Sequence, residues 1–192
     1  MSLCSRSGTR DPQAMRQWSG LLSPWVLNSR TESETAMQPT RFEERQASRL
    51  LGIQRRLDPQ ATDWEALWRE EYAPRLPEIR SCTTGKTCLG AYIAGGSDGL
   101  LEFVAGRPAR EGIEVPPGLI VRELPAATYA VFECTMADIG ATWHAIYGDW
   151  LPSSDYLADA TKACIEEFAP GCHEGTVPVR IFVPVMRRTQ AQ

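Results

Sequence analysis

The sequence lacks the features that identify several large classes of protein. Its six cysteines contain no CxxC pair, so zinc-ribbon and thioredoxin-type motifs are absent. No apolar run approaches the roughly 18 residues that a membrane-spanning helix needs. Only two histidines are present, His144 and His173, and there is no run of Lys or Arg. Because duplex binding draws on many cationic phosphate contacts, direct nucleic-acid binding is not expected, nor is a membrane protein.

What the sequence does contain is typical of an ordinary globular protein. Its 192 residues fit one domain or two small halves that share a core, and the formal net charge is −4. The apolar stretch "GLLSPWVL" (20–27) is broken by Ser23-Pro24 and lacks a cleavage site of small residues, so a signal peptide is not expected. Scattered cysteines without paired spacing are typical of free thiols in a reducing compartment, which predicts a cytoplasmic protein.

The chain divides into a tail and a regular part. Residues 1–40 are rich in Ser, Thr, Arg and Gln and show no sustained apolar periodicity, so we expect a flexible N-terminal tail. Residues 41–192 carry the regular patterns and are expected to form the folded domain.

An internal repeat organises this second part. The stretches "ALWREEYAPRLP" (66–77) and "ATWHAIYGDWLP" (141–152) are identical at five of twelve positions and lie 75 residues apart. Around each copy the same order of elements is expected, namely strand, helix, strand, strand. The first helix is expected to be capped by Thr62 with Glu65, and the second to begin near Thr135 and run through Leu151. The expected strands cover residues 47–57, 87–93, 100–106, 118–124, 127–135, 162–169 and 177–185.

This order predicts an α+β fold made of two similar halves. Duplicated units of this kind usually pair about a pseudo-twofold axis, and each helix then covers an antiparallel sheet. A cleft between the halves is expected to separate the two helices.

Three stretches that resemble catalytic or metal motifs have simpler interpretations. "GGSDG" (95–99) has nucleophile-elbow spacing, but a strand follows it where a helix is required, so a hairpin turn is favoured. "TTGKT" (83–87) lacks the first glycine of a phosphate loop and runs from helix to strand. Adjacent residues such as Cys172, His173 and Glu174 rarely converge on one ion. We therefore assign no catalytic residue, no metal and no cofactor.

Aromatic residues form one stripe on each expected helix. Trp68 and Tyr72 are spaced i, i+4, and Trp143 and Tyr147 repeat that spacing, so each pair lies on one helix face. Periodicity alone favours core packing for such stripes. Twofold symmetry would instead bring both to one cleft, where flat ligands could stack, and both interpretations stay open.

Glu166 is unusual within its expected strand. Alternation in "ACIEEFAP" groups Glu166 with Cys164 and Phe168, whereas Glu167 shares the opposite face with Ile165. A carboxylate on an apolar face is costly unless it has a partner, and no Lys or Arg is close in sequence. Charge combined with aromatic rings is the arrangement that recognises a lipophilic cation.

These pieces together resemble a known family. The stretches "RLLGIQRRL", "CLGAYI", "LLEFVAG", "LPAATYAVFECT", "TWHAIYGDWLP", "IEEFAP" and "VRIFVPV" resemble the GyrI-like, or AraC-type effector-binding, small-molecule-binding domain over about residues 45–186. The element of Tyr147, Trp150, Leu151 and Pro152, followed by Glu166, is the most specific part. Where many relatives carry a second acidic residue after the glycine matching Gly106, this chain has Arg107.

The resemblance implies a cleft for drug-like or cationic ligands with Glu166 at its floor. The expected ligand-binding residues are Glu166, Trp68, Tyr72, Phe103, Trp143, Tyr147 and Trp150. The leading hypothesis is a stand-alone module that sequesters or senses its ligand. One alternative is a hydrolase of reactive alkylating compounds with Glu166 as general base and Tyr72 or Tyr147 as proton donor. A second alternative, implied only by the family name, is a protein that acts on gyrase.

Overall fold

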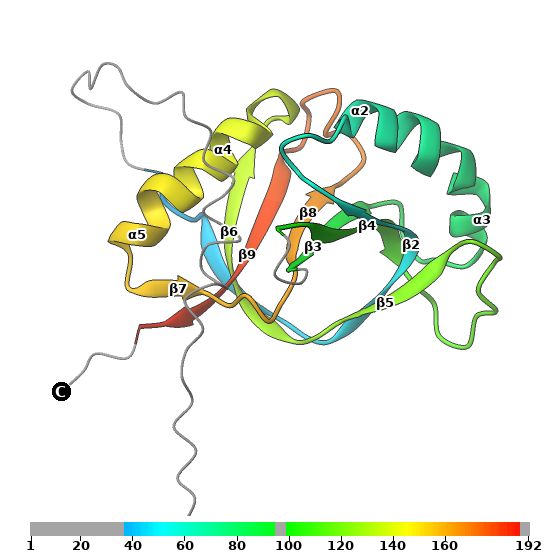
Figure 1. The fold of residues 1–192 in the computed structure, drawn as a ribbon, viewed down its shortest axis with the longest axis horizontal. Coiled ribbons are helices and arrows are strands. Elements are labelled where there is room, and N and C mark those ends of the chain that lie inside the picture. The colour runs from blue at the N-terminus through cyan, green and yellow to red at the C-terminus, as the bar shows by residue number, and fades with distance from the viewer. Residues whose placement is uncertain (1–36, 95–98, 189–192) are drawn as a thin grey trace, which may run out of the picture.

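The computed structural model describes residues 37–94 and 99–188, which form a nine-stranded antiparallel sheet with two helical segments (Figure 1). The strand order is β1-β6-β9-β8-β3-β4-β2-β5, and β7 pairs with β9 beside this path. The strand bounds are β1 Arg41–Arg45, β2 Ser48–Leu57, β3 Cys88–Ala94, β4 Leu101–Pro108, β5 Ile120–Leu124, β6 Ala127–Cys134, β7 Tyr156–Ala158, β8 Cys164–Phe168 and β9 Val179–Arg187. The α+β prediction is confirmed.

Each helical segment changes type along its length. The first contains α2 (Trp64–Ala66), a π-helical stretch (Leu67–Tyr72), a 3-10 turn (Ala73–Arg75) and α3 (Leu76–Ser81). The second contains a 3-10 turn (Met136–Asp138), α4 (Ile139–Ala145), a π-helical stretch (Ile146–Trp150) and α5 (Leu151–Ser153). Both therefore include the π-helical geometry that is rare in proteins and frequent at functional sites.

The first helix is capped differently from the capping box that the sequence suggests. Asp63, and not Thr62, is the N-cap residue, and its carboxylate accepts from the Ala66 amide at 2.9 Å. The Thr62 hydroxyl instead donates to the Asp58 carbonyl. Asp and Thr are both good N-cap residues, so local sequence could not decide between neighbours.

The sheet is a symmetric duplication. The first half supplies β2, β3 and β4, and the second half supplies their equivalents β6, β8 and β9. From the centre of the sheet outwards, the order is therefore β3-β4-β2 on one side and β8-β9-β6 on the other. The halves also exchange edge strands, because β1 precedes β2 but pairs with β6, while β5 precedes β6 but pairs with β2. Strand β1 was not expected from its sequence, since "RFEER" is almost entirely charged. As an edge strand it leaves most of these side chains in solvent.

The pseudo-twofold axis passes through the centre of the sheet, between β3 and β8. There Gly90 pairs with Glu166, and Ala91 pairs with Ile165. At the 75-residue offset of the repeat, Gly90 corresponds to Ile165 and Ala91 corresponds to Glu166. The symmetry operation therefore turns each pair into the other, and the axis lies between the two pairs. Glu166 therefore lies beside the symmetry axis, at the position equivalent to Ala91.

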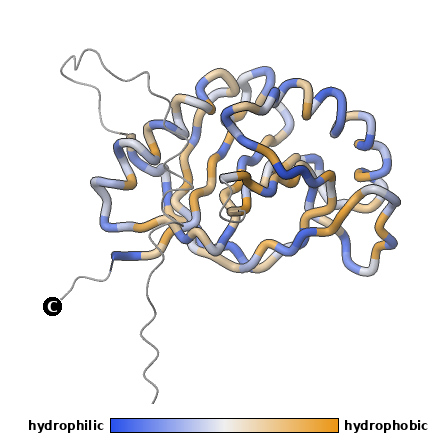
Figure 2. The backbone as a smooth tube through the Cα atoms, in the orientation of Figure 1, coloured by the Kyte–Doolittle hydropathy of each residue, from blue (hydrophilic) through white to orange (hydrophobic). Residues whose placement is uncertain are grey.

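The sheet carries an apolar cluster on each face. The helix-covered face buries residues such as Phe103, Ile146 and Ile181, and the opposite face buries Leu50 and Phe182. Figure 2 shows hydrophobic residues concentrated in the central strands and hydrophilic residues on the outer turns of the helices. No helix in the described part of the chain is long and apolar enough to cross a membrane.

Some sequence expectations lie outside the described residues. Residues 1–36 of the expected tail and most of the expected turn, residues 95–98, are among them. The end of the expected tail is ordered, because Thr40 uses both its amide and its hydroxyl to bond the Val131 carbonyl. The folded part therefore begins slightly earlier than residue 41.

Candidate ligand-binding cleft

A large cleft lies on the helix-covered face of the sheet. Its volume is about 1600 Å³. Both helical segments contribute to its walls, and β3 and β8 contribute to its floor. The lining includes aromatic, charged and thiol side chains, namely Trp64, Trp68, Tyr72, Cys88, Tyr92, Arg107, Trp143, Glu166 and Phe168. The cleft thus lies where the duplicated halves meet.

Glu166 lies at the floor of this cleft with two hydrogen-bond donors. Only 4% of the residue is exposed. The Trp143 indole Nε1 donates to Oε1 at 2.6 Å, and the Tyr92 hydroxyl donates to Oε2 at 2.7 Å. None of the ion pairs among residues 37–94 and 99–188 involves Glu166. The carboxylate is therefore held in a fixed orientation by neutral groups, without a counter-charge from the described protein.

Burial controls the protonation of this site. Desolvation raises the pKa of Glu166 above its usual value, and the hydrogen bonds from Trp143 and Tyr92 oppose that rise. Burial and the neighbouring carboxylate also raise the pKa of the Tyr92 hydroxyl well above its usual value. Tyr92 therefore remains a neutral donor to Glu166 near neutral pH.

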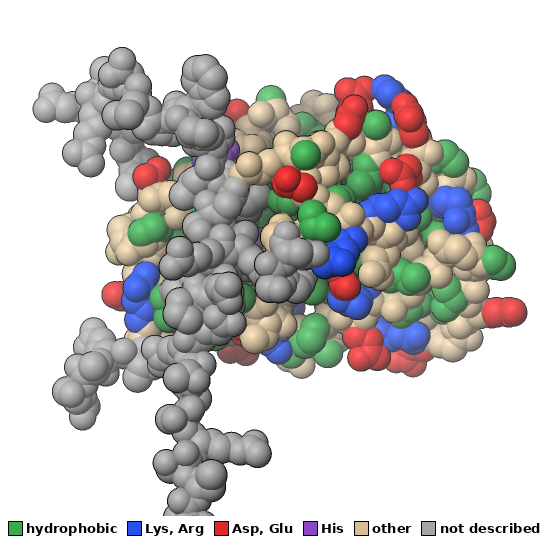
Figure 3. Space-filling model, in the orientation of Figure 1, with side chains coloured by type: hydrophobic (Ala, Val, Ile, Leu, Met, Phe, Trp, Pro, Cys, Tyr) green, Lys and Arg blue, Asp and Glu red, His purple; other side chains and the backbone are tan. Residues whose placement is uncertain are grey.

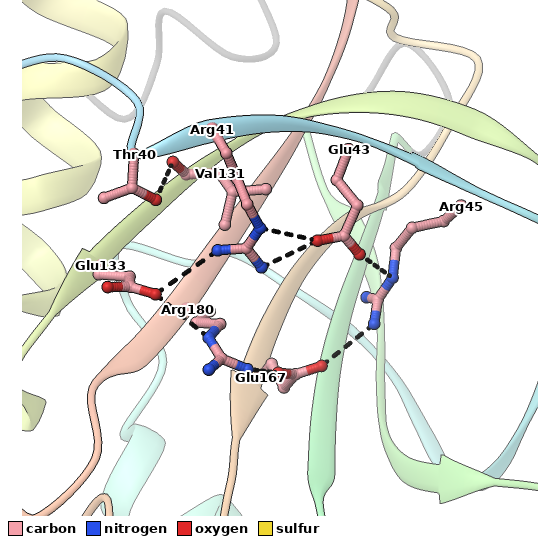
Figure 4. A network of polar contacts seen from close by, with 8 residues as sticks. All are labelled: Thr40, Arg41, Glu43, Arg45, Val131, Glu133, Glu167 and Arg180. Carbon is pink, nitrogen blue, oxygen red and sulfur yellow. Dashed lines mark hydrogen bonds and ion pairs between the residues drawn. The ribbon is translucent and has the colours of Figure 1, made fainter.

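Glu167 has the opposite environment. As strand alternation predicts, it lies on the other face of the sheet, where Arg45 and Arg180 contact its two oxygens at 3.1 and 2.9 Å. Figure 4 shows that these residues belong to a closed ring in which acidic and basic side chains alternate. The other members of the ring are Arg41, Glu43 and Glu133. The charge of Glu167 is therefore compensated by arginines on one face of the sheet, whereas the charge of Glu166 on the other face has no basic partner among the described residues.

Aromatic rings line the walls around Glu166. Trp68, Tyr72 and Trp143, which the repeat singled out, all line the cleft. The Trp68 ring centroid lies 4.9 Å from that of Tyr72 and 5.3 Å from that of Phe168. On the other wall, the Trp143 ring lies 5.9 Å from the Tyr92 ring. Rings from both halves therefore surround the carboxylate.

Three other residues expected at the site do not line the cleft. Phe103 is fully buried beneath the rings of Trp64 and Tyr92. Tyr147 lies beneath Trp143, with its ring stacked at 5.9 Å. Trp150 packs against Phe132 and Tyr156 in the core. The sequence placed these aromatics on the side of the sheet that the helices cover, but it could not separate the surface of the cleft from the layer below.

The cleft also contains residues that were not identified from the sequence, and four of them bear on its chemistry. Tyr92 lies on the same strand face as Cys88, and Phe168 on the same strand face as Glu166, so strand alternation could have found them. Trp64 lies at the start of the first helix, one turn before Trp68, and its indole donates to the Pro59 carbonyl. Arg107 was noted only as a departure from the family pattern, yet it is buried and lines the cleft.

Two histidines and a further cysteine also lie at the cleft. His144, Cys172 and His173 line the cleft. In the described part of the chain, no three His, Cys, Asp or Glu side chains gather so that they could hold a metal ion. On the face drawn in Figure 3, basic and acidic side chains are interspersed, with no continuous basic surface over the described residues.

Comparison with solved structures identifies the fold. SAV2435 bound to tetraphenylphosphonium superposes with a TM-score of 0.63 at 14% identity, covering 76% of this chain and 93% of that one. A protein of Staphylococcus aureus MU50 assigned to bacterial transcription regulation gives 0.55 at 16% identity, with coverages of 76% and 96%. The EcmrR C-terminal domain gives 0.53 at 13% identity, with coverages of 77% and 97%.

Sequence comparison identifies the family. No curated protein matches the chain. The family model described as the GyrI-like small molecule binding domain matches residues 38–186, which include both halves and every residue of the cleft. The chain therefore belongs to the GyrI-like family of small-molecule binding domains.

Proposed function

We propose that this domain binds an aromatic or amphipathic cation, with Glu166 as the counter-charge. The observation that carries the proposal is the environment of Glu166, a carboxylate at the cleft floor that has hydrogen-bond donors but no basic partner among the described residues. A buried charge of this kind is costly in the free protein, and a ligand cation would compensate it.

The aromatic walls support the same class of ligand. Trp68, Tyr72 and Trp143 offer apolar surface and π faces around the carboxylate, and aromatic faces attract cations by about 0.5–2 kcal/mol each. SAV2435, which shares the fold, has been solved with tetraphenylphosphonium, a large aromatic cation. EcmrR contains a comparable C-terminal domain. Sensing or sequestering a cation through this cleft agrees with the ligand found in SAV2435.

The contacts of Glu166 and Tyr147 bear differently on the hydrolase alternative. Each carboxylate oxygen of Glu166 accepts one donor, from Trp143 and Tyr92, and keeps a second lone pair that a ligand or a water could approach. By contrast, Tyr147 lies beneath the cleft surface with its hydroxyl 3.4 Å from Cys164 Sγ, so it is a poor proton donor for a bound substrate.

We also propose a reducing, cytoplasmic location. The support is that all five cysteines in the described part of the chain are free thiols. Disulfides are common in oxidising compartments and rare in the cytoplasm.

Titration of the full chain with tetraphenylphosphonium tests the proposal. Three tryptophans line the cleft, namely Trp64, Trp68 and Trp143, so binding should change the intrinsic fluorescence. We expect saturable 1:1 binding. Tetraphenylborate, an anion of the same shape, should bind at least about tenfold more weakly because Glu166 repels it. Absence of saturable tetraphenylphosphonium binding would contradict the proposal.

A further inference from the structure

Arg107 is a second buried charge in the cleft. It follows Gly106 near the end of β4, and alternation places its side chain on the same sheet face as Phe103 and Ala105. It lines the cleft, and only 6% of the residue is exposed. A guanidinium remains positively charged at any pH that the folded protein experiences. The cleft therefore contains one buried cation in addition to the buried Glu166.

The contacts of Arg107 leave part of its hydrogen-bonding capacity unused. Nη1 donates to the Gly85 carbonyl at 3.4 Å and Nη2 to Cys88 Sγ at 3.6 Å, which are both long contacts, and the Tyr72 hydroxyl is a further neighbour of the guanidinium. Its Nε is buried and has no acceptor among the described residues, and no carboxylate in that part of the chain forms an ion pair with it. By contrast Arg69, at the same cleft, is paired with both Glu65 and Glu70.

A guanidinium with free donors has a preferred partner. Its planar arrangement of N–H groups matches the two oxygens of a carboxylate or the oxygens of a phosphate or sulfonate. An unpaired buried charge is costly, and an oxyanion on a ligand would satisfy both the charge and the unused Nε donor. The exposed Lys86, which follows Gly85 in the cleft lining, adds positive charge near this point.

The sheet register fixes how the two charges are arranged. Glu166 pairs with Gly90 on β3, and Gly90 pairs with Ala105 on β4. Arg107 is therefore two strands away from Glu166 and two residues further along. With usual strand dimensions, their Cα atoms are roughly 12 Å apart. Gly90 and Ala105 lie between them, and the ring of Phe103 packs over Gly90, so a ligand that reached both charges would have to extend above this ring across about the same distance.

We propose that Arg107 forms an oxyanion subsite, so that the cleft selects aromatic zwitterions over simple aromatic cations. The ligand would place its cationic group at Glu166 and a carboxylate, or a similar oxyanion, at Arg107. This inference rests on the proposed function, because it assumes that the cleft binds a small aromatic molecule. It adds a requirement that Glu166 alone does not impose, namely a negative group on the far side of the same ligand.

A matched pair of dyes tests the subsite. Rhodamine B carries an aromatic cation and a carboxylate, and its ethyl ester is the same dye without the negative charge. We expect the full-length protein at pH 7 to bind rhodamine B at least about tenfold more tightly than the ester. Arg107→Gln should remove this preference by weakening rhodamine B alone. Arg49→Gln removes one positive charge from an exposed position of β2 outside the cleft lining, and it should leave the preference unchanged.

The other possible results of these titrations separate a failure of the Arg107 subsite from a failure of the proposed function. Equal affinities for the two dyes, or a preference that survives Arg107→Gln, would overturn the subsite and leave the proposed cation site in place if tetraphenylphosphonium still binds. If neither dye nor tetraphenylphosphonium binds, the proposed function fails and the subsite fails with it.

The melting temperature of the ligand-free protein gives a second, independent measurement. Arg107→Met keeps much of the side-chain volume and removes a buried charge without a partner, so we expect a higher melting temperature. Rhodamine B should then raise the melting temperature of the wild-type protein more than that of the variant. A lower melting temperature for ligand-free Arg107→Met would show that the guanidinium is already satisfied within the protein, and it would overturn the proposal.

Discussion

The Tyr92 hydroxyl, which belongs to the first half of the duplication, donates a 2.7 Å hydrogen bond to Glu166, which belongs to the second. This hydrogen bond and the one from Trp143 stabilise the charged form of Glu166, whereas burial destabilises that form. The balance between these two effects sets the pH at which Glu166 ionises, and it has measurable consequences for binding and stability.

Cation affinity should rise with pH. Because a ligand cation binds the ionised form of Glu166, affinity should increase as pH rises through the pKa of that carboxyl and then become constant. The midpoint should lie above the ordinary 4.5, since burial raises the pKa. Tyr92→Phe removes a donor to the carboxylate, so the midpoint should move to still higher pH. Calorimetric titrations of tetraphenylphosphonium across pH check both results, and an unchanged midpoint in Tyr92→Phe would contradict the assigned hydrogen bond.

The stability of the ligand-free protein should have the opposite pH dependence. Since the pKa of Glu166 is higher in the folded state, the folded protein binds more protons than the unfolded chain between the two pKa values. The free energy of unfolding should therefore fall as pH rises through that window. Glu166→Gln should remove this loss and raise the free energy of unfolding at pH 7 by about 0.5–2 kcal/mol. Urea denaturation at several pH values measures it, and a destabilised Glu166→Gln protein would argue against an uncompensated charge.

A close crossing of β2 and β4 should make Gly52 intolerant of substitution. Gly52 pairs with Gly106, and a Cβ atom on Gly52 would lie 1.9 Å from the Ala105 carbonyl oxygen. We expect Gly52→Ala to lower the free energy of unfolding by about 1–3 kcal/mol or more. Gly140→Ala is the control, because that helical Cβ would meet nothing within 4 Å, and it should stabilise the protein by about 0.5–1 kcal/mol. Equal effects at both glycines would contradict the strand register.

Substitutions at Trp68 and Trp150 should have different effects, because the two side chains lie in different places. Trp150 packs in the core against Phe132 and Tyr156, whereas Trp68 lines the cleft. Trp150→Ala should cost about 3–5 kcal/mol of stability and leave the affinity of the folded protein for tetraphenylphosphonium unchanged. Trp68→Ala should weaken binding with a smaller loss of stability. The reverse pattern in denaturation and binding measurements would place the ligand elsewhere.

Much of the fold follows from local patterns in the sequence. The repeat of Trp and Tyr at matching positions correctly predicts two equivalent helices. Their tyrosines have similar contacts, because the hydroxyl of Tyr72 lies 3.4 Å from the sulfur of Cys88 at the start of β3, and that of Tyr147 lies 3.4 Å from the sulfur of Cys164 at the start of β8. Strand alternation correctly separates Glu166 from Glu167.

Other features depend on contacts that local patterns do not encode. The exchange of β1 and β5 between halves requires pairing across about half the chain, and the charged sequence of β1 gives no strand signal. The bond between Tyr92 and Glu166 depends on the register of β3 against β8. The burial of Arg107 depends on how the first helical segment covers the end of β4. These long-range relationships determine the hydrogen bonds of the cleft, so they emerged only from the structure.

The same substitution at two adjacent glutamates separates a cation site at Glu166 from a general effect of removing an acidic group. Calorimetry with tetraphenylphosphonium at pH 7 should show that Glu166→Gln weakens binding about tenfold or more, a loss of at least ~1.4 kcal/mol. Glu167→Gln makes the same chemical change on the opposite face, within the ion-pair ring, and should alter affinity less than about twofold, because it does not reach the cleft. Equal losses at the two positions, or no loss at Glu166, would contradict a cation site built on Glu166.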